Sequence, residues 1–517
     1  MTRRPPECSV HTVMILGAAT AEATASHGEY YCARGHASDT YRCLGRTGLT
    51  VSAIGFGCQG VRISDIRHQA ALREALYSGC NLIDSAAHYG AGDADELVGQ
   101  VLAQSDGLSR DRLVIVTKLG AFSGSDLAWL RSQGGVDDTR LSDDPQVWYS
   151  FAADYLRGQL KRSLARLSLE KVDIVLLESP EFLYDVSIAA RPNASEEEHV
   201  QFVAQALLRA FECLEELVHE GLAGWYGVTS NALSVKLGEQ LSLPLPLLVE
   251  TAEAAGGTNH HFGVVQMPLS IFDVTAHEED SEYSLQQFAS RLGLGMMVGR
   301  PLRPVVNGRI VRLTDFDTAG VVRLRRLMKA TASLENEFAI GLGKAFEVEG
   351  LEGSTRLFDN AVRLKDVAAS LDDYVLWREF VEDVLEMELS GLIGQIDAGL
   401  NGPLKVAWTF WLERYIHAVS QLVDGLSLRC ARSSQRRSRR IARKLRPLVD
   451  SGESEARLAQ LSVAAVRDLP GVDAVLVGMR RIQYAIDAME TMNWTVKTQS
   501  PARIAGIAQK LISSGVR

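Results

Sequence analysis

Three residues in the first quarter of the chain have side chains and a spacing suited to acid–base chemistry. Asp84 follows the strand-like run 81–83, Tyr89 comes five residues later, and Lys118 follows the apolar run 112–117. A free phenol titrates at about pH 10, which is too high for an efficient acid at neutral pH. A nearby ammonium lowers the pKa of a phenol, and a carboxylate keeps that ammonium charged. The three residues therefore predict a tyrosine that protonates a carbonyl oxygen as hydride arrives.

Each of these residues also has an ordinary structural interpretation when it is taken alone. Asp84 could cap a helix, Tyr89 could pack a loop, and Lys118 could be a surface charge. The combination favours an active site, because successive strand ends of a parallel barrel converge at one mouth.

The elements that must position these side chains are short apolar strands alternating with amphipathic helices. A hairpin is expected first, because 41–44 and 49–52 flank a glycine turn. Strands that are apolar on both faces indicate a parallel sheet. Eight such units predict an α/β fold, the (β/α)8 TIM barrel, with its active site at the C-terminal strand ends. The eight runs are 53–56, 81–83, 112–117, 172–177, 224–228, 264–267, 293–298 and 472–477.

Four segments are expected along the 517 residues. Residues 1–39 show no sustained period and are interpreted as a disordered extension, with a weak targeting segment as the alternative. Residues 40–302 should hold strands 1–7 of the barrel. Residues 303–450 should form an all-helical insertion between strands 7 and 8. Residues 451–517 should supply the last barrel strand and helix and the C-terminal helices.

The insertion is helical by period at 371–389 and 407–426. It could be a lid, a dimerisation arm or a partner-binding subdomain. The basic run 429–446 is interpreted as a solvated helix face or flexible segment rather than a nucleic-acid or membrane patch. One aromatic stripe at helical spacing is predicted to be core rather than a ligand box: Trp408, Phe410, Trp411 and Tyr415.

A second stretch, 121–150, is rich in Ser, Gly and Asp and follows the third strand. It should either hang over the active site or be an unstructured insert.

The bulk composition narrows the class of protein. The formal net charge of −10 argues against general nucleic-acid affinity. Seven scattered cysteines without a C-x-x-C motif indicate neither disulfides nor a structural metal site, which fits a reducing, cytoplasmic compartment. No uncharged apolar run is long enough to cross a membrane, so no membrane association is expected.

The motifs, taken in order, resemble the aldo-keto reductase family over roughly 41–302 and 456–495. They are RCLGRTGLTVSAIGFGCQG, IDSAAHYG with DELVG, VIVTK, KVDIVLLESPE, GLAGWYGVTSNAL, VVQMPLS and LPGVDAVLVGMRR. The resemblance implies catalytic roles for Asp84, Tyr89 and Lys118. It also implies NADP(H), in preference to NAD(H), and no metal.

The family's cofactor positions carry over to this chain as follows. Ser230 and Asn231 match the pair that hydrogen-bonds the nicotinamide carboxamide, and Gln266 matches a glutamine near the same group. A helix N-terminus with guanidinium donors suits a 2′-phosphate, with surface charge as the alternative for the two arginines. The pyrophosphate and adenosine-phosphate loops correspond to Arg300, Pro301, Leu302, Gly478, Met479, Arg480 and Arg481.

The sequence departs from the family after the fourth strand, where Glu178 replaces the usual histidine. Burial raises the pKa of a carboxyl group, so a neutral Glu178 could donate a hydrogen bond to the substrate oxygen. Enone reduction is then a further activity to consider. An ionised Glu178 would instead repel a developing oxyanion. His88 adjoins Tyr89, but it lies on a different loop from Glu178 and not at the position of the family's histidine.

The expected activity is NADP(H)-dependent reduction of an aldehyde or ketone, or oxidation of the corresponding alcohol or sugar. The alternative is a catalytically weak NADP(H)-binding sensor that acts on a protein partner, or by self-association, through residues 303–450. A Schiff-base aldolase using Lys118 would leave the cofactor motifs unexplained.

Overall fold

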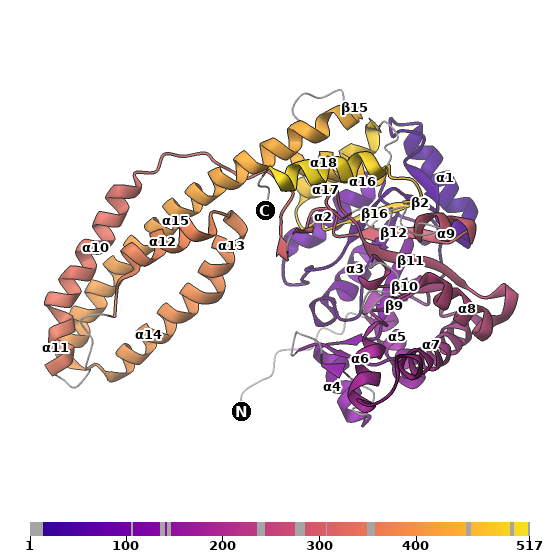
Figure 1. Cartoon of the computed structure of the whole chain (residues 1–517), viewed down its shortest axis with the longest axis horizontal. Coiled ribbons are helices and arrows are strands. Elements are labelled where there is room, and N and C mark those ends of the chain that lie inside the picture. Colours follow the sequence, from indigo (N-terminus) through magenta and orange to yellow (C-terminus); the bar gives the residue numbers. More distant parts are fainter. Residues whose placement is uncertain are drawn as a thin grey trace. The chain divides into compact units, whose positions relative to one another are not determined.

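The computed structural model describes residues 14–104, 107–134, 140–141, 146–234, 243–273, 285–306, 308–348, 357–450, 456–496 and 501–514. The chain divides into two compact units (Figure 1). The first, here the barrel unit, comprises Met1–Leu313 and Lys444–Arg517. The second, here the helical unit, is Thr314–Arg443.

Eight parallel strands form a closed barrel at the centre of the barrel unit, in the order β10-β11-β12-β16-β3-β4-β5-β9. The predicted TIM barrel is confirmed, and the helical unit lies in the chain between its seventh and eighth strands. The strands are β3 (Ile54–Gly57), β4 (Leu82–Asp84), β5 (Val114–Leu119), β9 (Val172–Glu178), β10 (Ala223–Thr229), β11 (Phe262–Pro268), β12 (Gly295–Gly299) and β16 (Ala474–Val477).

The predicted hairpin closes one end of the barrel. β1 (Tyr41–Cys43) and β2 (Thr50–Ser52) pair antiparallel, and residues of the hairpin share a buried cluster with residues from the strands. Gly45 sits in the turn with φ +51°, and a Cβ there would collide with the backbone of β12 at Gly295. The turn therefore requires glycine, because it needs both a left-handed conformation and a close approach.

Helices surround the barrel strands (Figure 1). The longest of them, α7, begins with a capping box in which Ser195 and Glu198 satisfy each other's backbone N–H groups. The helices of this unit, apart from α1 and α4, are α2 (Ile66–Tyr77), α3 (Asp93–Gln104), α5 (Ala153–Leu167), α6 (Phe182–Ala190), α7 (Glu196–His219), α8 (Leu245–Gly256), α9 (Leu285–Arg291), α16 (Leu458–Arg467), α17 (Ile482–Glu490) and α18 (Pro501–Ser513).

The expectation of a disordered extension over 1–39 is wrong for its described part. Residues 21–32 form helix α1 (Ala21–Cys32), which is capped by the side chain of Thr20. His27 is buried, and its Nε2 lies 3.1 Å from the carbonyl oxygen of Gly79. The helix lacks a sustained apolar stripe, so periodicity does not reveal it. Residues 1–13, including those of the suggested targeting segment, lie outside the described residues.

The stretch 121–150 is neither a plain loop nor unstructured in its described part. It contains α4 (Gly124–Ser132) and a three-stranded sheet of β6 (Ala121–Phe122), β8 (Trp148–Tyr149) and β7 (Arg140–Leu141). Buried Phe122, Leu127 and Leu130 give it a small core of its own.

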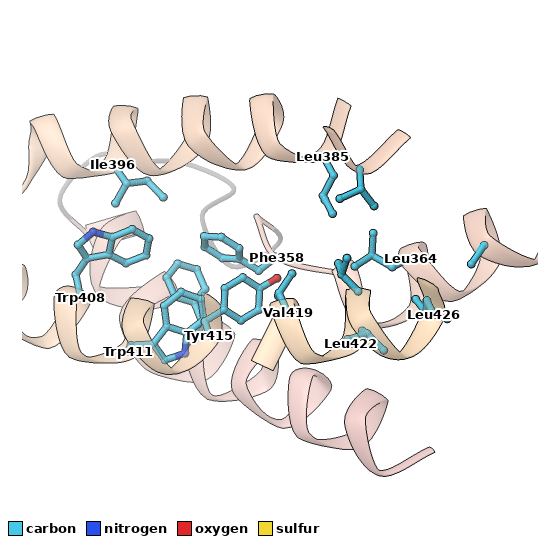
Figure 2. Close-up of a cluster of buried hydrophobic side chains, with 14 of the residues drawn as sticks. Phe358, Leu364, Leu385, Ile396, Trp408, Trp411, Tyr415, Val419, Leu422 and Leu426 are labelled. Atoms are coloured by element: carbon cyan, nitrogen blue, oxygen red, sulfur yellow. The ribbon is translucent and has the colours of Figure 1, made fainter. Parts of the chain in front are cut away.

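The helical unit has its own hydrophobic core, built around three aromatic residues of α15 (Figure 2). Trp408, Trp411 and Tyr415 are buried, as predicted, whereas Phe410 is 64% exposed and is not part of that core. Residues 429–445 of the basic run lie within α15. The helices are α10 (Leu324–Ile340), α11 (Leu342–Val348), α12 (Asn360–Leu371), α13 (Tyr374–Glu379), α14 (Glu386–Gly399) and α15 (Gly402–Leu445), with a π-helix at Phe380–Leu385.

The helical pattern predicted at 371–389 is confirmed from Tyr374 onward, but the helix begins three residues later than predicted, because the chain turns at two aspartates. Asp372 has φ 41°, and the side chain of Asp373 accepts hydrogen bonds from the N–H groups of Val375 and Leu376. Aspartate suits both positions, since it tolerates the left-handed region and is a strong N-cap.

Two short antiparallel pairs complete the barrel unit: β13 (Val305–Val306) with β14 (Arg309–Ile310), and β15 (Val449–Asp450) with β17 (Thr495–Val496). The six cysteines in the described part of the chain are free, as predicted. Among the described residues, no helix combines the length and apolar character needed to span a bilayer.

Candidate active site

The strand register brings the predicted catalytic residues to one end of the barrel. Asp84 is the last residue of β4, Lys118 lies near the end of β5, and Glu178 is the last residue of β9. Thr229, at the end of β10, is in register with both Glu178 and Gln266. Because the barrel is parallel, all of these positions face the mouth where its strands end.

Asp84 and Lys118 form a buried ion pair at this mouth. The Lys118 Nζ lies 2.7 Å from Asp84 Oδ1 and donates a second hydrogen bond, of 3.0 Å, to the carbonyl oxygen of Ser85. Burial lowers the pKa of Lys118, but the charge of Asp84 outweighs it, with help from Tyr89 and Glu178, and the net shift is upward. Lys118 is therefore a fixed positive charge.

Tyr89 lies beside that charge, with the Lys118 Nζ 4.8 Å from the centre of its ring. Lys118 does lower the pKa of the phenol, as predicted. The net shift is nevertheless upward, because burial and the charges of Glu178 and Asp84 act in the opposite direction. The expectation of a lowered pKa for Tyr89 is therefore wrong in its net direction. Its phenol is protonated at neutral pH and suited to donating a proton.

Of the two protonation states considered for Glu178, the ionised one is favoured, because its pKa is lowered overall. Burial raises the pKa of Glu178, but His88, Lys118 and Arg300 outweigh burial and lower it overall. His88 Nδ1 lies 3.1 Å from Glu178 Oε2. His88, which the sequence analysis did not assign to the site, therefore lies at the site in contact with Glu178.

The residues expected near the nicotinamide carboxamide are engaged with other side chains. The Ser230 hydroxyl donates a 2.7 Å hydrogen bond to Glu181 and accepts one from the Ala232 N–H. The Gln266 amide nitrogen donates to Asp84 at 3.0 Å, and its oxygen accepts from the Thr229 hydroxyl at 2.7 Å. Gln266 thereby supports Asp84 directly. Asn231 is exposed.

The residues expected around the phosphates follow the last two barrel strands at the same mouth. Arg300, Pro301 and Leu302 come directly after β12. Gly478, Met479, Arg480 and Arg481 lie between β16 and α17. The Met479 side chain is buried, so Met479 can contact a ligand only through its backbone.

The loops after β12 and β16 have accessible backbone and hydrogen-bond donors that could contact phosphates. A Cβ on Gly299 or Gly478 would meet nothing within 4 Å. The first turn of α17 has no side-chain cap and no acidic residue. Arg480 and Arg481 are both exposed, and the Arg480 guanidinium lies beside Gly60. Uncapped N–H groups next to guanidinium groups suit an anion. These residues fit the phosphate end of a phosphorylated dinucleotide. Ser230 and Gln266 fit the carboxamide as well, provided that they bind it in addition to the partners that they already have.

Backbone strain is concentrated at this mouth. Of the five non-glycine residues with positive φ in the described chain, three follow strand ends here: Ala91, Ser179 and Arg300. Strain of this kind persists where surrounding structure enforces it and is common at functional sites.

Sequence reasoning missed two residues of the site. Glu181 is buried against Ser230, and Tyr149 of β8 packs its ring on Phe182 at a centroid distance of 4.5 Å. Burial raises the pKa of Tyr149, and the charge of Glu178 adds to this. The position of 121–150 after the third strand indicated a segment over the site, but not which residue reaches it.

The arrangement can move one proton at a fixed place. A protonated phenol beside a fixed ammonium can donate to a substrate oxygen, and its phenolate would be stabilised by the same ammonium. Among the described residues no cluster of possible metal ligands is present.

Comparison with known proteins supports this assignment of fold and chemistry. The model of the Aldo/keto reductase family matches residues 53–312, just over half of the chain. A D-threo-aldose 1-dehydrogenase from a Pseudomonas species is 27% identical over 201 residues, which cover 37% of this chain and 54% of that protein. The match therefore spans about half the length of this curated relative.

Solved structures of related proteins are more distant. An aldo-keto reductase from Pseudomonas aeruginosa is 24% identical, with 52% of this chain and 80% of that chain covered and a TM-score of 0.34. An aldo/keto reductase from Klebsiella pneumoniae, in complex with NADP and acetate, is 16% identical, with 91% and 95% covered and a TM-score of 0.41. Both TM-scores are low, and these likenesses add nothing to the family match.

Proposed function

The chain belongs to the aldo/keto reductase family, and we propose that it is an NADP(H)-dependent oxidoreductase that interconverts an alcohol and the corresponding carbonyl compound. The observation that carries this proposal is the buried Asp84–Lys118 pair with Tyr89 against it. Structural roles account poorly for such a group, because a buried ion pair is often no more stabilising than apolar residues of the same size.

NADP(H) is proposed as the cofactor because the phosphate end of the site offers cationic and uncapped donors. Arg480, Arg481 and the first turn of α17 would hold the 2′-phosphate. Ser230, Asn231 and Gln266 would face the nicotinamide. When bound, the dinucleotide supplies or accepts the hydride.

Tyr89 moves the proton in the proposed reaction. In reduction its hydroxyl donates to the carbonyl oxygen, and in oxidation its phenolate takes the proton from the alcohol. Lys118 stabilises the phenolate, and Asp84 with Gln266 keeps Lys118 in place. These groups are already oriented before substrate arrives, so little reorganisation is needed during the reaction.

The charge on Glu178 bears on the class of substrate. Forward and reverse reactions share one transition state, so a fixed charge selects the substrate rather than the direction. An ionised carboxylate repels a transition state in which the oxygen becomes negative, and attracts one in which the carbon becomes positive. The hemiacetal carbon of a sugar is of the second kind, since its ring oxygen supports positive charge. We therefore propose aldose oxidation to the lactone, which agrees with the name of the Pseudomonas relative.

A substrate panel tests the proposed function. The purified full-length protein is mixed with NADP+ and cyclic aldoses, and separately with NADPH and simple aldehydes, ketones and enones. Dinucleotide absorbance is followed in a single turnover. We expect turnover with at least one aldose and slower reaction with simple carbonyl compounds. Tight NADPH binding without turnover of any substrate would instead favour the sensor function.

Replacing Arg480 or Arg481 with Ala is expected to weaken NADPH binding by about 10- to 100-fold, because each loses a charge-assisted hydrogen bond worth about 1.5–3 kcal/mol. Binding of NADH, which lacks the 2′-phosphate, should change far less. Fluorescence titration of both dinucleotides measures the difference. Arg325→Ala, an exposed residue of α10, is the matched control. Equal loss for both dinucleotides would contradict a 2′-phosphate contact.

A further inference from the structure

His88 and Glu178 reach the same place from different parts of the barrel. Glu178 ends β9, whereas His88 immediately precedes Tyr89 in the loop that follows β4. His88 Nδ1 and Glu178 Oε2 lie 3.1 Å apart, and the two side chains are only 16% and 15% exposed. Both atoms are buried, and neither has a hydrogen bond of standard geometry to any described residue, so their close approach is a charge pairing.

The loop that carries His88 is held by a hydrogen bond from Ser123, and the His88 ring contacts its neighbour in the sequence. The Ser123 hydroxyl donates a 3.0 Å hydrogen bond to the His88 carbonyl oxygen. The His88 ring packs edge-on against Tyr89, with ring centres 4.7 Å apart. His88 therefore touches both the proton-transferring phenol and the carboxylate that replaces the family's histidine.

Other charged and titratable groups surround this pair. Lys118 and Arg300 lower the pKa of Glu178, while Glu178 itself raises the pKa of Tyr89, Tyr149 and Glu181. Asp84 adds a second negative charge near Tyr89. Without a partner, Glu178 would oppose phenolate formation at the very residue that must become a phenolate in oxidation.

We propose that His88 is a positioning residue of the active site, which pairs with Glu178 and so allows a carboxylate to sit beside Tyr89. A carboxylate can only accept, so the Nδ1 of His88 carries the shared proton. The pair restores an imidazole to the site from a different loop. This inference rests on the proposed function, because the phenolate matters only if Tyr89 transfers a proton.

The proposal predicts that the effect of His88 depends on Glu178. His88→Phe should lower the aldose oxidation rate by about tenfold or more at neutral pH and move the rising limb of its pH profile upward. In the Glu178→Gln background, the same change should cost less than about twofold. His88→Gln, which keeps an N–H donor, should recover part of the loss. His417→Phe, on the surface of α15, is the matched control.

A second measurement needs no cofactor and no turnover. The side-chain carboxyl carbon of Glu178 is followed by NMR in the ligand-free protein and assigned by its absence in Glu178→Gln. It should titrate below the ordinary value of about 4.3. In His88→Phe, where burial is no longer offset by the imidazole, the midpoint should rise by about 1–3 pH units.

Equal rate losses in the two backgrounds, or an unchanged carboxyl midpoint in His88→Phe, would overturn the proposal. If the midpoint shifts but the unsubstituted protein turns over no substrate, the reaction and the role assigned to His88 both fall, while the pair stands. The two failures are thus distinguishable.

Discussion

Tyr89→Phe is expected to reduce the oxidoreductase rate by about a thousandfold or more, because the ring stays in place while its hydroxyl is lost. General acid–base catalysis by one positioned side chain contributes about 10²- to 10⁴-fold. The measurement is the single-turnover rate with a substrate found in the panel.

The control for Tyr89→Phe is cofactor binding. The NADPH dissociation constant should stay within about twofold of that of the unsubstituted protein, because the hydroxyl is assigned to the proton and not to the dinucleotide. Tyr30→Phe, an exposed tyrosine of α1, should leave the rate unchanged. Full residual activity in Tyr89→Phe would reject the proposed mechanism.

Lys118→Met is expected to abolish turnover and also to destabilise the barrel. Asp84 is 5% exposed, and losing Lys118 removes its ion-pair partner. Removing one partner of a buried pair costs about 3–5 kcal/mol of unfolding free energy. Because folding raises the pKa of Lys118, the stabilisation is complete below about pH 10 and is lost as pH rises through the folded pKa. Denaturant unfolding at pH 7 measures the loss.

The double substitution Lys118→Met with Asp84→Asn separates the two effects. Removing the uncompensated carboxylate should recover much of the stability, whereas turnover should stay absent. A Lys118→Met protein as stable as the unsubstituted one would show that Asp84 finds another partner or takes up a proton at little cost.

The barrel could be predicted because its strands are apolar on both faces. Runs such as 112–117 are apolar enough to favour burial on both faces, and eight of them separated by helical segments leave few other folds. Asp84 and Lys118 interrupt such runs at their C-terminal ends, which made both visible as site residues. Helix α1 has no comparable stripe. The break at Asp372 depends on turn chemistry that the helical period around it conceals.

The electrostatics of the site could not be predicted, because they depend on contacts between distant segments. Glu178 was identified, but its ionised state follows from the approach of His88 across the barrel mouth. The net pKa of Tyr89 depends on burial as well as on Lys118. Tyr149 reaches the site through a small sheet whose register no local pattern shows.

The place of the helical unit in the chain has a consequence for synthesis. β16 pairs with β12 on one side and β3 on the other, but residues 300–473 must be translated before it appears. At about 5–20 residues per second, seven strands would wait on the order of 10–30 s with two unpaired edges. Unpaired edges promote aggregation. The hydrophobic core of the helical unit would fold during this interval, because that unit is translated before β16. The protein should therefore depend on chaperones in the cell more than a barrel whose strands emerge without interruption.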